Sequence, residues 1–372
     1  MKKICYVVTI PLTIRAFFIP QLQYLANNGF NVSVICSPDE KLQEELGDTV
    51  KFIPVEIPRG FSVGGSIKAI KELWRVFEEE QFDLIQYSTP NAALYASIAA
   101  KAVGCGVRNY HLMGFRYLGA HGFGKVILKT IEKVTCALST SIECVSKSNL
   151  EIGVKKGIFP RQKAAVVWNG STGGVDLKRF DCGRRSEYRA EIREKYGIAA
   201  DEFVYGFVGR VTRDKGVNEI LEAFSQIDGA KLLMVGPQEE ADTLNQSLYQ
   251  SSLADDRIVY TGSVNDVEKY YSAIDVLLLP SYREGFGNVA IEAAAMGTPA
   301  IVSKIPGPID AIQEGETAFT VESHNAGMLL EKMNLICRVD YVKMGRNSAI
   351  FAKSQFDSAT LCEKICERKK TL

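Results

Sequence analysis

The sequence alternates short runs of Val, Ile and other apolar residues with longer segments of helical period, and this rhythm starts twice along the chain. Strands that are buried on both faces are almost continuously apolar, so the alternation is typical of parallel sheets covered by helices on both sides. The predicted fold class is therefore α/β, with two βαβ arrays. The length of 372 residues agrees, because chains of this size usually form two hydrophobic cores.

The expected strands are short and rich in β-branched residues, and they form two groups. In the first half of the chain they are Ile4–Val8, Asn31–Cys36, Lys51–Val55, Asp83–Tyr87, Val107–His111, Ser141–Ser146 and Ala164–Trp168. In the second half they are Phe203–Val208, Lys231–Val235, Arg257–Tyr260, Asp275–Leu279 and Ala300–Ser303. After Ala318 the chain is expected to be helical.

The segment between the two groups begins with NGSTGGVDLKRF, and its glycines suit a hinge. We therefore predict an N-terminal Rossmann-like domain at residues 1–170 and a C-terminal Rossmann-like domain at residues 171–353. Residues 354–372 are expected to form a helix that packs back on the N-terminal domain.

Charge and cysteine usage exclude several classes of function. Lys and Arg number 44, as do Asp and Glu, so no global field attracts nucleic acid and no nucleic-acid partner is predicted. The nine cysteines are scattered, and neither they nor the three histidines have the spacing of a metal site. We expect buried thiols, no metal, and a cytoplasmic protein that is soluble or peripheral to the membrane, since no apolar run is long enough to span a bilayer.

The segment Ser281–Pro299, SYREGFGNVAIEAAAMGTP, follows an expected strand of the second array. Ligands of an open parallel sheet bind outside the carboxyl ends of its strands. Gly285 and Gly287 permit a tight turn, after which a helix can begin. The first N–H groups of that helix, those of Asn288 and Val289, would form a seat for phosphate at the positive end of the helix dipole.

Two carboxylates and two cations accompany this seat. Glu284 precedes the helix and Glu292 lies about one turn inside it, and carboxylates accept hydrogen bonds from sugar hydroxyls. The sequence GRVTRDKG, after the first strand of the second array, places Arg210 and Lys215 in a loop where they can neutralise a diphosphate. Each residue alone has a structural alternative, as a helix-entry carboxylate or a surface charge. Their joint placement after two strands of one domain favours a ligand site.

These residues resemble the retaining GT-B glycosyltransferases, a family that includes bacterial capsule, O-antigen and lipid-linked oligosaccharide transferases. The resemblance covers most of the chain and is densest in EGFGNVAIE, from Glu284 to Glu292, and in GRVTRDKG. It implies two Rossmann-like domains that face a cleft. The C-terminal domain would bind a nucleotide sugar, and the N-terminal domain would bind the acceptor.

The resemblance also implies roles for the matching residues. Glu284 would bind hydroxyls of the donor sugar and Glu292 the ribose, while Arg210 and Lys215 would bind the diphosphate. Because the departing nucleoside diphosphate gains charge, these cations would stabilise the transition state more than the ground state. The loop and helix start that would hold phosphate and sugar, together with a contact to the base, comprise Gly285, Phe286, Gly287, Asn288, Val289 and Val264.

In the N-terminal domain, His111 ends an expected strand and opens HLMGFRYLG. This segment resembles the family's segment whose histidine lies beside the sugar, although a histidine at a strand end can also be structural. Arg116 follows as a candidate ligand of the acceptor or of phosphate. Many relatives have a glycine-rich loop after the first strand, whereas this chain has TIPLTIR. Its Arg15 either meets a lipid pyrophosphate or is an exposed helix residue.

The resemblance implies a retaining transferase that moves an N-acetylhexosamine-type sugar from a UDP-sugar to an undecaprenyl-diphosphate-linked saccharide. The cations would replace a metal, because no DxD-type acidic pair is evident. The expected helix from Gly122 to Ala137 carries Lys125, Lys129 and Lys133 and either lies against an anionic membrane or is a solvated face. The alternatives are a UDP-sugar epimerase of the same architecture and a non-catalytic nucleotide-sugar-binding protein.

Overall fold

The computed structural model describes residues 1–60, 62–238 and 241–372. The chain divides into two compact units. The N-terminal unit consists of Met1–Gly173 and Ala359–Leu372, and the C-terminal unit is Gly174–Ser358. The chain thus leaves the C-terminal unit five residues later than the sequence-based boundary after residue 353, because the helix that ends at Phe356 belongs to the C-terminal unit up to its last residue.

The N-terminal unit contains a parallel sheet in the order β3-β2-β1-β4-β5-β6-β7. Its strands are β1 Lys2–Val7, β2 Phe30–Cys36, β3 Val50–Pro54, β4 Leu84–Tyr87, β5 Val107–Leu112, β6 Ser141–Cys144 and β7 Ala164–Ala165. All of them overlap the expected strands. The expected strand Ala164–Trp168 is shorter than predicted, and the chain leaves the sheet after two residues.

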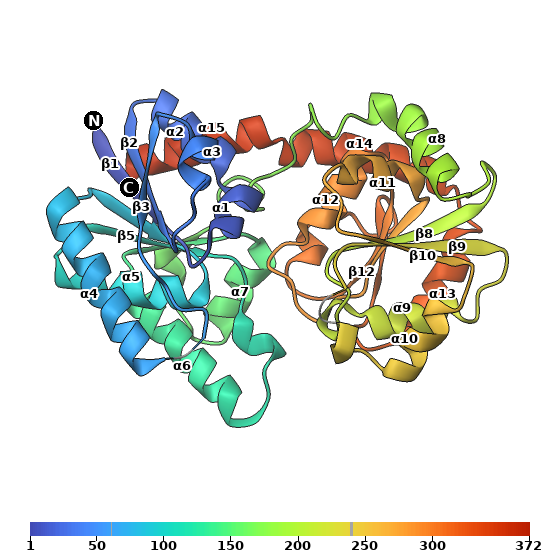
Figure 1. The fold of residues 1–372 in the computed structure, drawn as a ribbon, viewed down its shortest axis with the longest axis horizontal. Helices are drawn as coiled ribbons and strands as arrows, with labels where there is room; N and C mark the ends of the chain where they lie inside the picture. The colour runs from blue at the N-terminus through green and yellow to red at the C-terminus, as the bar shows by residue number, and fades with distance from the viewer. Residues whose placement is uncertain (61, 239–240) are drawn as a thin grey trace. The chain divides into compact units, whose positions relative to one another are not determined.

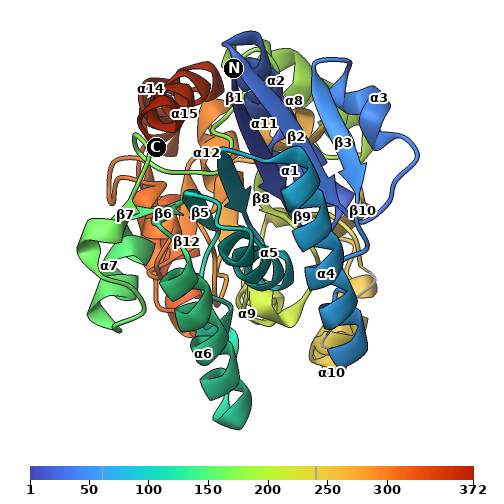
Figure 2. The ribbon, with the colours of Figure 1, turned by 90° about the vertical axis from the view of Figure 1, so that its left-hand side faces the viewer.

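Helices cover both faces of this sheet. They are α1 Pro11–Phe17, α2 Ile19–Asn27, α3 Leu42–Leu46, α4 Val63–Glu80, α5 Pro90–Ala102, α6 Gly122–Leu138, α7 Lys147–Lys155 and α15 Ser358–Thr371. Helices α4, α5 and α6 lie side by side over one face (Figures 1 and 2). Helices α1 and α2 pack on the other face, together with Cys366 of α15.

The C-terminal unit contains a second parallel sheet in the order β10-β9-β8-β11-β12-β13. Its strands are β8 Phe203–Val208, β9 Ala230–Val235, β10 Ile258–Gly262, β11 Val276–Leu279, β12 Ala300–Ser303 and β13 Ala318–Val321. The expectation of helix after Ala318 is wrong at this point. The four residues AFTV form an edge strand that pairs in register with β12, and so short a segment carries little periodicity to reveal it.

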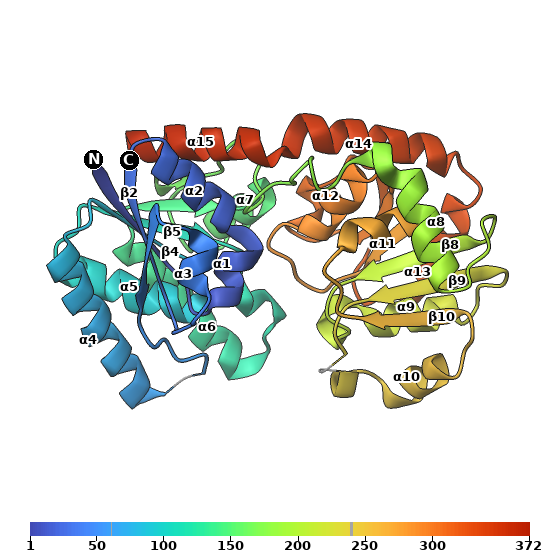
Figure 3. The ribbon, with the colours of Figure 1, turned by 45° about the horizontal axis from the view of Figure 1, so that its top comes forward.

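The second sheet is also covered on both faces. Its helices are α8 Arg185–Lys195, α9 Val217–Phe224, α10 Gln246–Leu253, α11 Val267–Ala273, α12 Asn288–Ala295, α13 Ala326–Ile336 and α14 Tyr341–Phe356. Helices α9 and α13 share one core with the strands. On the other face α8 packs on α11, and α14 lies along α12 (Figure 3).

Short 3-10 helices complete both units. They are η1 Arg116–Gly119, η2 Arg161–Lys163, η3 Cys182–Arg184, η4 Arg213–Lys215, η5 Ala241–Thr243 and η6 Pro308–Asp310. Within the described residues, we find no helix that combines the length and the apolar character required to traverse a bilayer.

Candidate functional site

The strand order reverses direction between β8 and β11, which are direct neighbours in the second sheet. Such a switch point opens a crevice at the carboxyl ends of the two strands, because their connections leave toward opposite faces of the sheet. The loops that follow these strands contain GRVTRDKG and SYREGFG. The two motifs singled out in the sequence therefore meet at one edge of one sheet.

Glycines bring the backbones of these loops into close contact. A Cβ atom at Gly216, where φ is +74°, would lie 2.2 Å from the carbonyl oxygen of Pro280. A Cβ atom at Gly236, where φ is +139°, would lie 1.9 Å from the carbonyl oxygen of Gly209. Both positions exclude any side chain for reasons of conformation and of space. The edge is thus a compact platform of touching loops.

On this platform, Lys215 and Glu284 form an ion pair, with Lys215 Nζ 2.7 Å from Glu284 Oε1. The same carboxylate oxygen accepts a hydrogen bond of 2.9 Å from Ser281 Oγ. The structure therefore brings together the predicted diphosphate cation and the predicted sugar-binding carboxylate. A ligand that carries phosphates beside sugar hydroxyls can reach both groups at once.

Asp214 stabilises the loop that carries Lys215. Its backbone carbonyl accepts a hydrogen bond from the N–H of Tyr282, and its carboxylate accepts one of 2.6 Å from Thr212 Oγ1. Burial raises the pKa of this carboxyl, but the Thr212 hydrogen bond and the charges of Arg283, Lys215 and Arg210 outweigh burial and hold the pKa below its ordinary value. Arg210 is exposed at this edge, as a ligand for a diphosphate must be.

Helix α12 begins at Asn288, where the sequence analysis placed its start, and ends at Ala295, ahead of Gly297 and Pro299. Its N-cap residue Gly287 has a left-handed φ of +95°. The neighbouring Phe286 is buried and packs edge-on against Phe356, with 5.3 Å between the ring centroids. The phenylalanine of the EGFG sequence therefore anchors the loop in the core. Its ring is therefore not accessible to a ligand.

Glu292 lies one turn into this helix and is largely buried. Its Oε2 atom accepts a hydrogen bond of 2.8 Å from the hydroxyl of Tyr271, which is fully buried. Burial raises the pKa of Glu292 to about 7, against the lowering effects of the Tyr271 hydrogen bond and the Arg179 charge. A carboxyl with this pKa can accept or donate a hydrogen bond near neutral pH.

Arg179, which was not predicted from the sequence, contacts the loop that follows β10 at the candidate site. Its guanidinium donates to Glu268 Oε2 at 2.8 Å and to the carbonyl oxygen of Asn265 at 2.7 Å. Asn265 follows Val264, the predicted base contact, so Arg179 holds this loop after β10. The sequence signal was the segment NGSTGGVDLKRF, in which Arg179 is the arginine. Asp176 of the same segment caps the local turn, since its Oδ1 accepts a hydrogen bond from the N–H of Lys178.

The predicted residues of the N-terminal unit lie on three different elements, β5, α1 and η1. His111 is 7% exposed, its ring lies edge-on against Phe18, and neither ring nitrogen has a partner among the described residues. Burial lowers the pKa of His111 to about 4, so the imidazole is neutral. It lines a small cavity with Glu143 and with Leu361 of α15. This position is that of a core histidine, so contact with a sugar stays a prediction that the geometry does not favour.

Arg15 already has partners within its own unit. Its Nη2 lies 2.7 Å from Asp39 Oδ1, and its Nε contacts Glu45. The structure therefore favours an anchor between α1 and the neighbouring segments, and a contact with lipid pyrophosphate stays a prediction. Arg116, in η1, is exposed and forms no hydrogen bond or ion pair with the residues the structure describes. It remains available to a ligand.

The first sheet has its own switch point, between β1 and β4, and two threonines meet there. Thr9 Oγ1 lies 2.7 Å from Thr89 Oγ1, and the N–H of Thr9 also donates to Thr89 Oγ1. Thr89 has a φ of +64°, which is rare for a β-branched residue. Backbone strain of this kind is often found at ligand sites. No feature of the sequence signals such a conformation at a threonine.

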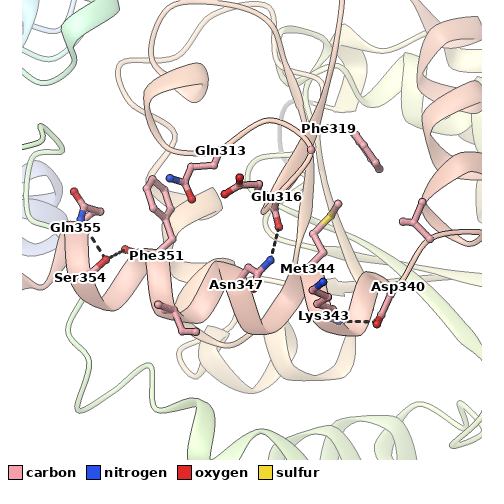
Figure 4. A pocket seen from close by; sticks show the side chains of 13 residues that line it. Gln313, Glu316, Phe319, Asp340, Lys343, Met344, Asn347, Phe351, Ser354 and Gln355 are labelled. Carbon is pink, nitrogen blue, oxygen red and sulfur yellow. Dashed lines mark hydrogen bonds between the residues drawn. The ribbon is translucent and has the colours of Figure 1, made fainter.

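A pocket of about 840 Å³ lies elsewhere in the C-terminal unit, between the segment before β13 and α14 (Figure 4). Gln313, Glu316, Phe319, Asn347 and Phe351 are among the residues that line it. It contains none of the residues of the two motifs. Among the described residues, no three or more His, Cys, Asp or Glu side chains gather as metal ligands would, and independence of metal stays a prediction.

Two parallel-sheet α/β units, with cations after β8 and carboxylates after β11, define a glycosyltransferase of the GT-B class. Residues 21–172 match the model of Glycosyltransferase Family 4, and residues 188–349 match that of Glycosyl transferases group 1. The chain belongs to this family of glycosyltransferases and is a transferase enzyme.

Among its relatives is the capsular polysaccharide biosynthesis glycosyltransferase CapM of Staphylococcus aureus, 27% identical over 98% of this chain and 96% of the relative. Another is the UDP-Gal:alpha-D-GlcNAc-diphosphoundecaprenol alpha-1,3-galactosyltransferase of Escherichia coli, 26% identical over 86% of this chain and 84% of the relative. Among solved structures, Anabaena HepE in complex with UDP aligns with a TM-score of 0.81 at 19% identity and covers all of both chains. At that identity the likeness establishes the fold alone.

Proposed function

We propose that the chain transfers a sugar from a UDP-sugar to a hydroxyl of a saccharide carried on undecaprenyl diphosphate, with retention at the anomeric carbon. The observation that carries this proposal is the contact between Lys215 and Glu284 at the switch point of the second sheet. This contact places a group that can bind phosphate beside a group that can bind hydroxyls, so one sugar nucleotide could reach both. The product would extend a bacterial surface polysaccharide.

In this proposal the charge of the departing UDP is stabilised by fixed groups of the protein. Lys215, Arg210 and the N-terminus of α12 all lie at the carboxyl edge, and their charges and dipoles need little rearrangement as the bond to the sugar breaks. Glu284 would hold hydroxyls of the sugar, and Glu292 would hold the ribose. The cations would take the place of a metal, and the leaving phosphate would accept the proton of the acceptor hydroxyl.

The names of the relatives support the acceptor class. The Escherichia coli relative is named for transfer to GlcNAc-diphosphoundecaprenol, and the Staphylococcus aureus relative for capsular polysaccharide biosynthesis. The donor named for the Escherichia coli relative is UDP-Gal, whereas the sequence analysis favoured an N-acetylhexosamine. Both kinds of donor therefore belong in the test.

The test is a donor panel of UDP-GlcNAc, UDP-GalNAc, UDP-Gal and UDP-Glc with undecaprenyl-diphosphate-linked GlcNAc. Release of UDP and the mass of the lipid product are followed, with and without EDTA. We expect release that depends on the acceptor, with one preferred donor. Epimerisation of UDP-GlcNAc without acceptor would support the epimerase, and binding of UDP-sugar without turnover across a wider acceptor panel would support a non-catalytic binding protein.

We further propose that α6 contacts the anionic inner face of the cytoplasmic membrane. Phe123 is 79% exposed and Val126 59% exposed, and the lysines of α6 lie beside them. Glu132 is turned into the core, so the exposed surface of α6 carries no carboxylate. Apolar side chains flanked by lysines are the pattern of an interfacial helix.

Co-sedimentation with phosphatidylglycerol vesicles at low and high salt tests this contact. Binding is expected at low salt, and Phe123→Ser should weaken it. Ile350→Ser is the matched control, because Ile350 is 69% exposed on α14 of the other unit. Equal binding to phosphatidylcholine vesicles, or equal loss in both variants, would contradict the proposal.

A further inference from the structure

A second pocket of the C-terminal unit, of about 390 Å³, is lined by arginines. It lies between α8, α14 and the segments that precede β11 and β12, and Arg185, Arg189 and Arg346 line it together with Asp275. Asp275 directly precedes β11, and Pro299 directly precedes β12. The pocket is thus at the amino edge of the sheet, opposite the carboxyl edge that carries Lys215 and Glu284.

The one carboxylate in this lining is already shared between two cations. Asp275 Oδ1 lies 2.8 Å from Arg189 Nη2, and Asp275 Oδ2 lies 2.9 Å from Arg193 Nη2. Oδ2 also accepts a hydrogen bond from the N–H of Val204 at 2.8 Å. Both oxygens of Asp275 are therefore occupied, and no second carboxylate lines the pocket among the described residues.

Arg185 has only uncharged acceptors. Its Nη1 donates to the carbonyl oxygen of Met296 and to Thr298 Oγ1, and its Nη2 donates to the carbonyl oxygen of Ile274. The pKa of Arg185 is lowered to about 10, mainly by burial and to a lesser extent by the neighbouring charge of Arg189. The positive charge of this pocket is therefore incompletely balanced.

These bonds give Arg185 and Arg189 a structural role, because they satisfy carbonyl groups where α11 and α12 end. That role does not extend to Arg346. It is exposed on α14, lines the pocket, and makes no hydrogen bond or ion pair with the residues the structure describes. The guanidinium of Arg185 also has five N–H groups, more than its three bonds use.

We propose that this pocket binds a small phosphorylated molecule, with its phosphate between Arg185, Arg189 and Arg346. Planar guanidinium groups bind phosphate oxygens in pairs, and an incoming dianion would offset the mutual repulsion of the arginines. The volume exceeds that of a phosphate, and Tyr341 and Pro299 line the remainder, so a sugar or similar ring attached to the phosphate has a surface to pack on. The site is separate from the proposed donor site.

The test is isothermal titration of the full chain with inorganic phosphate and with glucose 1-phosphate at constant ionic strength, with chloride as the balancing anion. Both ligands should bind, and Arg346→Gln should weaken binding about tenfold, as expected for the loss of one charge-assisted contact. Arg338→Gln, which removes another exposed arginine that does not line the pocket, should leave the affinity unchanged. Lys215→Ala should also leave it unchanged, because Lys215 belongs to the other edge of the sheet.

Tighter binding of glucose 1-phosphate would identify a phosphorylated sugar as the ligand, and equal binding would identify the free anion. The proposal fails if neither ligand binds at about 10 mM, the weakest affinity of interest. It also fails if Lys215→Ala abolishes binding while Arg346→Gln does not, since both ligands would then occupy the donor site. Equal weakening by Arg338→Gln and Arg346→Gln would show a general charge effect and would overturn it as well.

Discussion

Lys215 and Glu284 are 69 residues apart in the sequence, and their side chains meet at 2.7 Å between Nζ and Oε1. Their side chains are 22% and 14% exposed, so the pair is shielded but can be reached. Each residue belongs to a different loop, and the two loops follow neighbouring strands. The pair therefore exists only because β8 and β11 lie side by side at the switch point of the sheet.

Replacing either member of this pair should remove most of the activity and leave the fold intact. We expect Lys215→Ala and Glu284→Gln each to lower kcat/KM by about 100-fold to 1000-fold, the usual effect of removing one group that stabilises transition-state charge. Release of UDP measures this. In the double variant the losses should combine less than multiplicatively, because each residue orients the other. Strict multiplication of the two losses would show that they act independently.

The sequence predicted that these two loops share one ligand site, and it did so for a physical reason. In a parallel sheet the carboxyl ends of neighbouring strands share an edge, so motifs that follow such strands must converge. The bounds of α12 could also be predicted, because a glycine precedes its start and Gly297 and Pro299 follow its end. The sequence did not predict the residues that contact the site from other elements. Arg179 and Tyr271 act through contacts with Asn265 and Glu292 that no local spacing encodes.

Glu292 should make both stability and donor binding depend on pH. Its pKa of about 7 in the fold exceeds the value of about 4.5 that an exposed glutamate has. The folded state therefore holds the proton more tightly, and its contribution to stability is complete below pH 4.5 and is lost as the pH rises through 7. The loss is at most about 3 kcal/mol. Thermal unfolding between pH 5 and 8 should show this slope, and Glu292→Gln should reduce it.

Glu132 provides the matched control for Glu292. Burial raises its pKa to about 7 as well, but it lies in α6 of the N-terminal unit and is not one of the residues proposed to bind the nucleotide. Glu132→Gln should also flatten the pH dependence of stability. Only Glu292→Gln should flatten the pH dependence of UDP binding. If both variants change UDP binding alike, Glu292 is not a ligand of the nucleotide.

Arg179 should act on the nucleotide through its neighbours. Arg179→Ala removes the bonds to Glu268 and to the carbonyl oxygen of Asn265, so the loop after β10 loses its anchor. We expect the KM for the donor to rise about tenfold with a smaller change in kcat. The midpoint of the pH dependence should also move to higher pH, because the Arg179 charge lowers the pKa of Glu292.

Arg179→Lys separates positioning from simple destabilisation. The lysine keeps the charge but cannot bond to Glu268 and Asn265 with the same fork geometry. It should therefore restore the pH midpoint while only partly restoring KM. A variant that recovers neither property would indicate a structural role for Arg179.

The contact between the two site loops should tolerate no side chain at Gly216. In Gly216→Ala the new Cβ would lie 2.2 Å from the carbonyl oxygen of Pro280, so the loops must separate. Gly229→Ala is the control, because Gly229 has a similar φ of +68° but nothing within 4 Å of its Cβ position. In both variants an alanine must adopt the left-handed backbone conformation, which lowers the free energy of unfolding by about 1 kcal/mol. Only Gly216→Ala should also lose activity and several degrees of thermal stability. Similar behaviour of both variants would show that the tight contact has no function.

The way in which the C-terminal helix is attached to the N-terminal unit could not be predicted from sequence patterns. A helix was expected to pack on the N-terminal domain, but the means of attachment was not predicted. Lys369 is fully buried, and its Nζ lies 2.7 and 2.6 Å from the two carboxylate oxygens of Glu143 in β6. These residues are separated by 226 positions. A lysine in ERKK at the end of a chain has the pattern of a solvated charge, and only the packing of α15 on the sheet buries it.

This buried pair should respond very differently to single and double replacement. Lys369→Met leaves the carboxylate of Glu143 buried with Arg368, whose Nε lies 3.9 Å from Glu143 Oε1, as its remaining ion-pair partner, which should cost about 3 kcal/mol of unfolding free energy. Lys369→Met combined with Glu143→Leu removes both charges and should recover much of that loss. The reason is that the free-energy cost of desolvating the two charges offsets most of their attraction. Lys370→Met, at an exposed neighbouring position, should be close to neutral. Urea unfolding measures all three variants. If the double variant is no more stable than the single one, the helix is held by the geometry of the ion pair itself, because apolar contacts in its place would not restore the attachment.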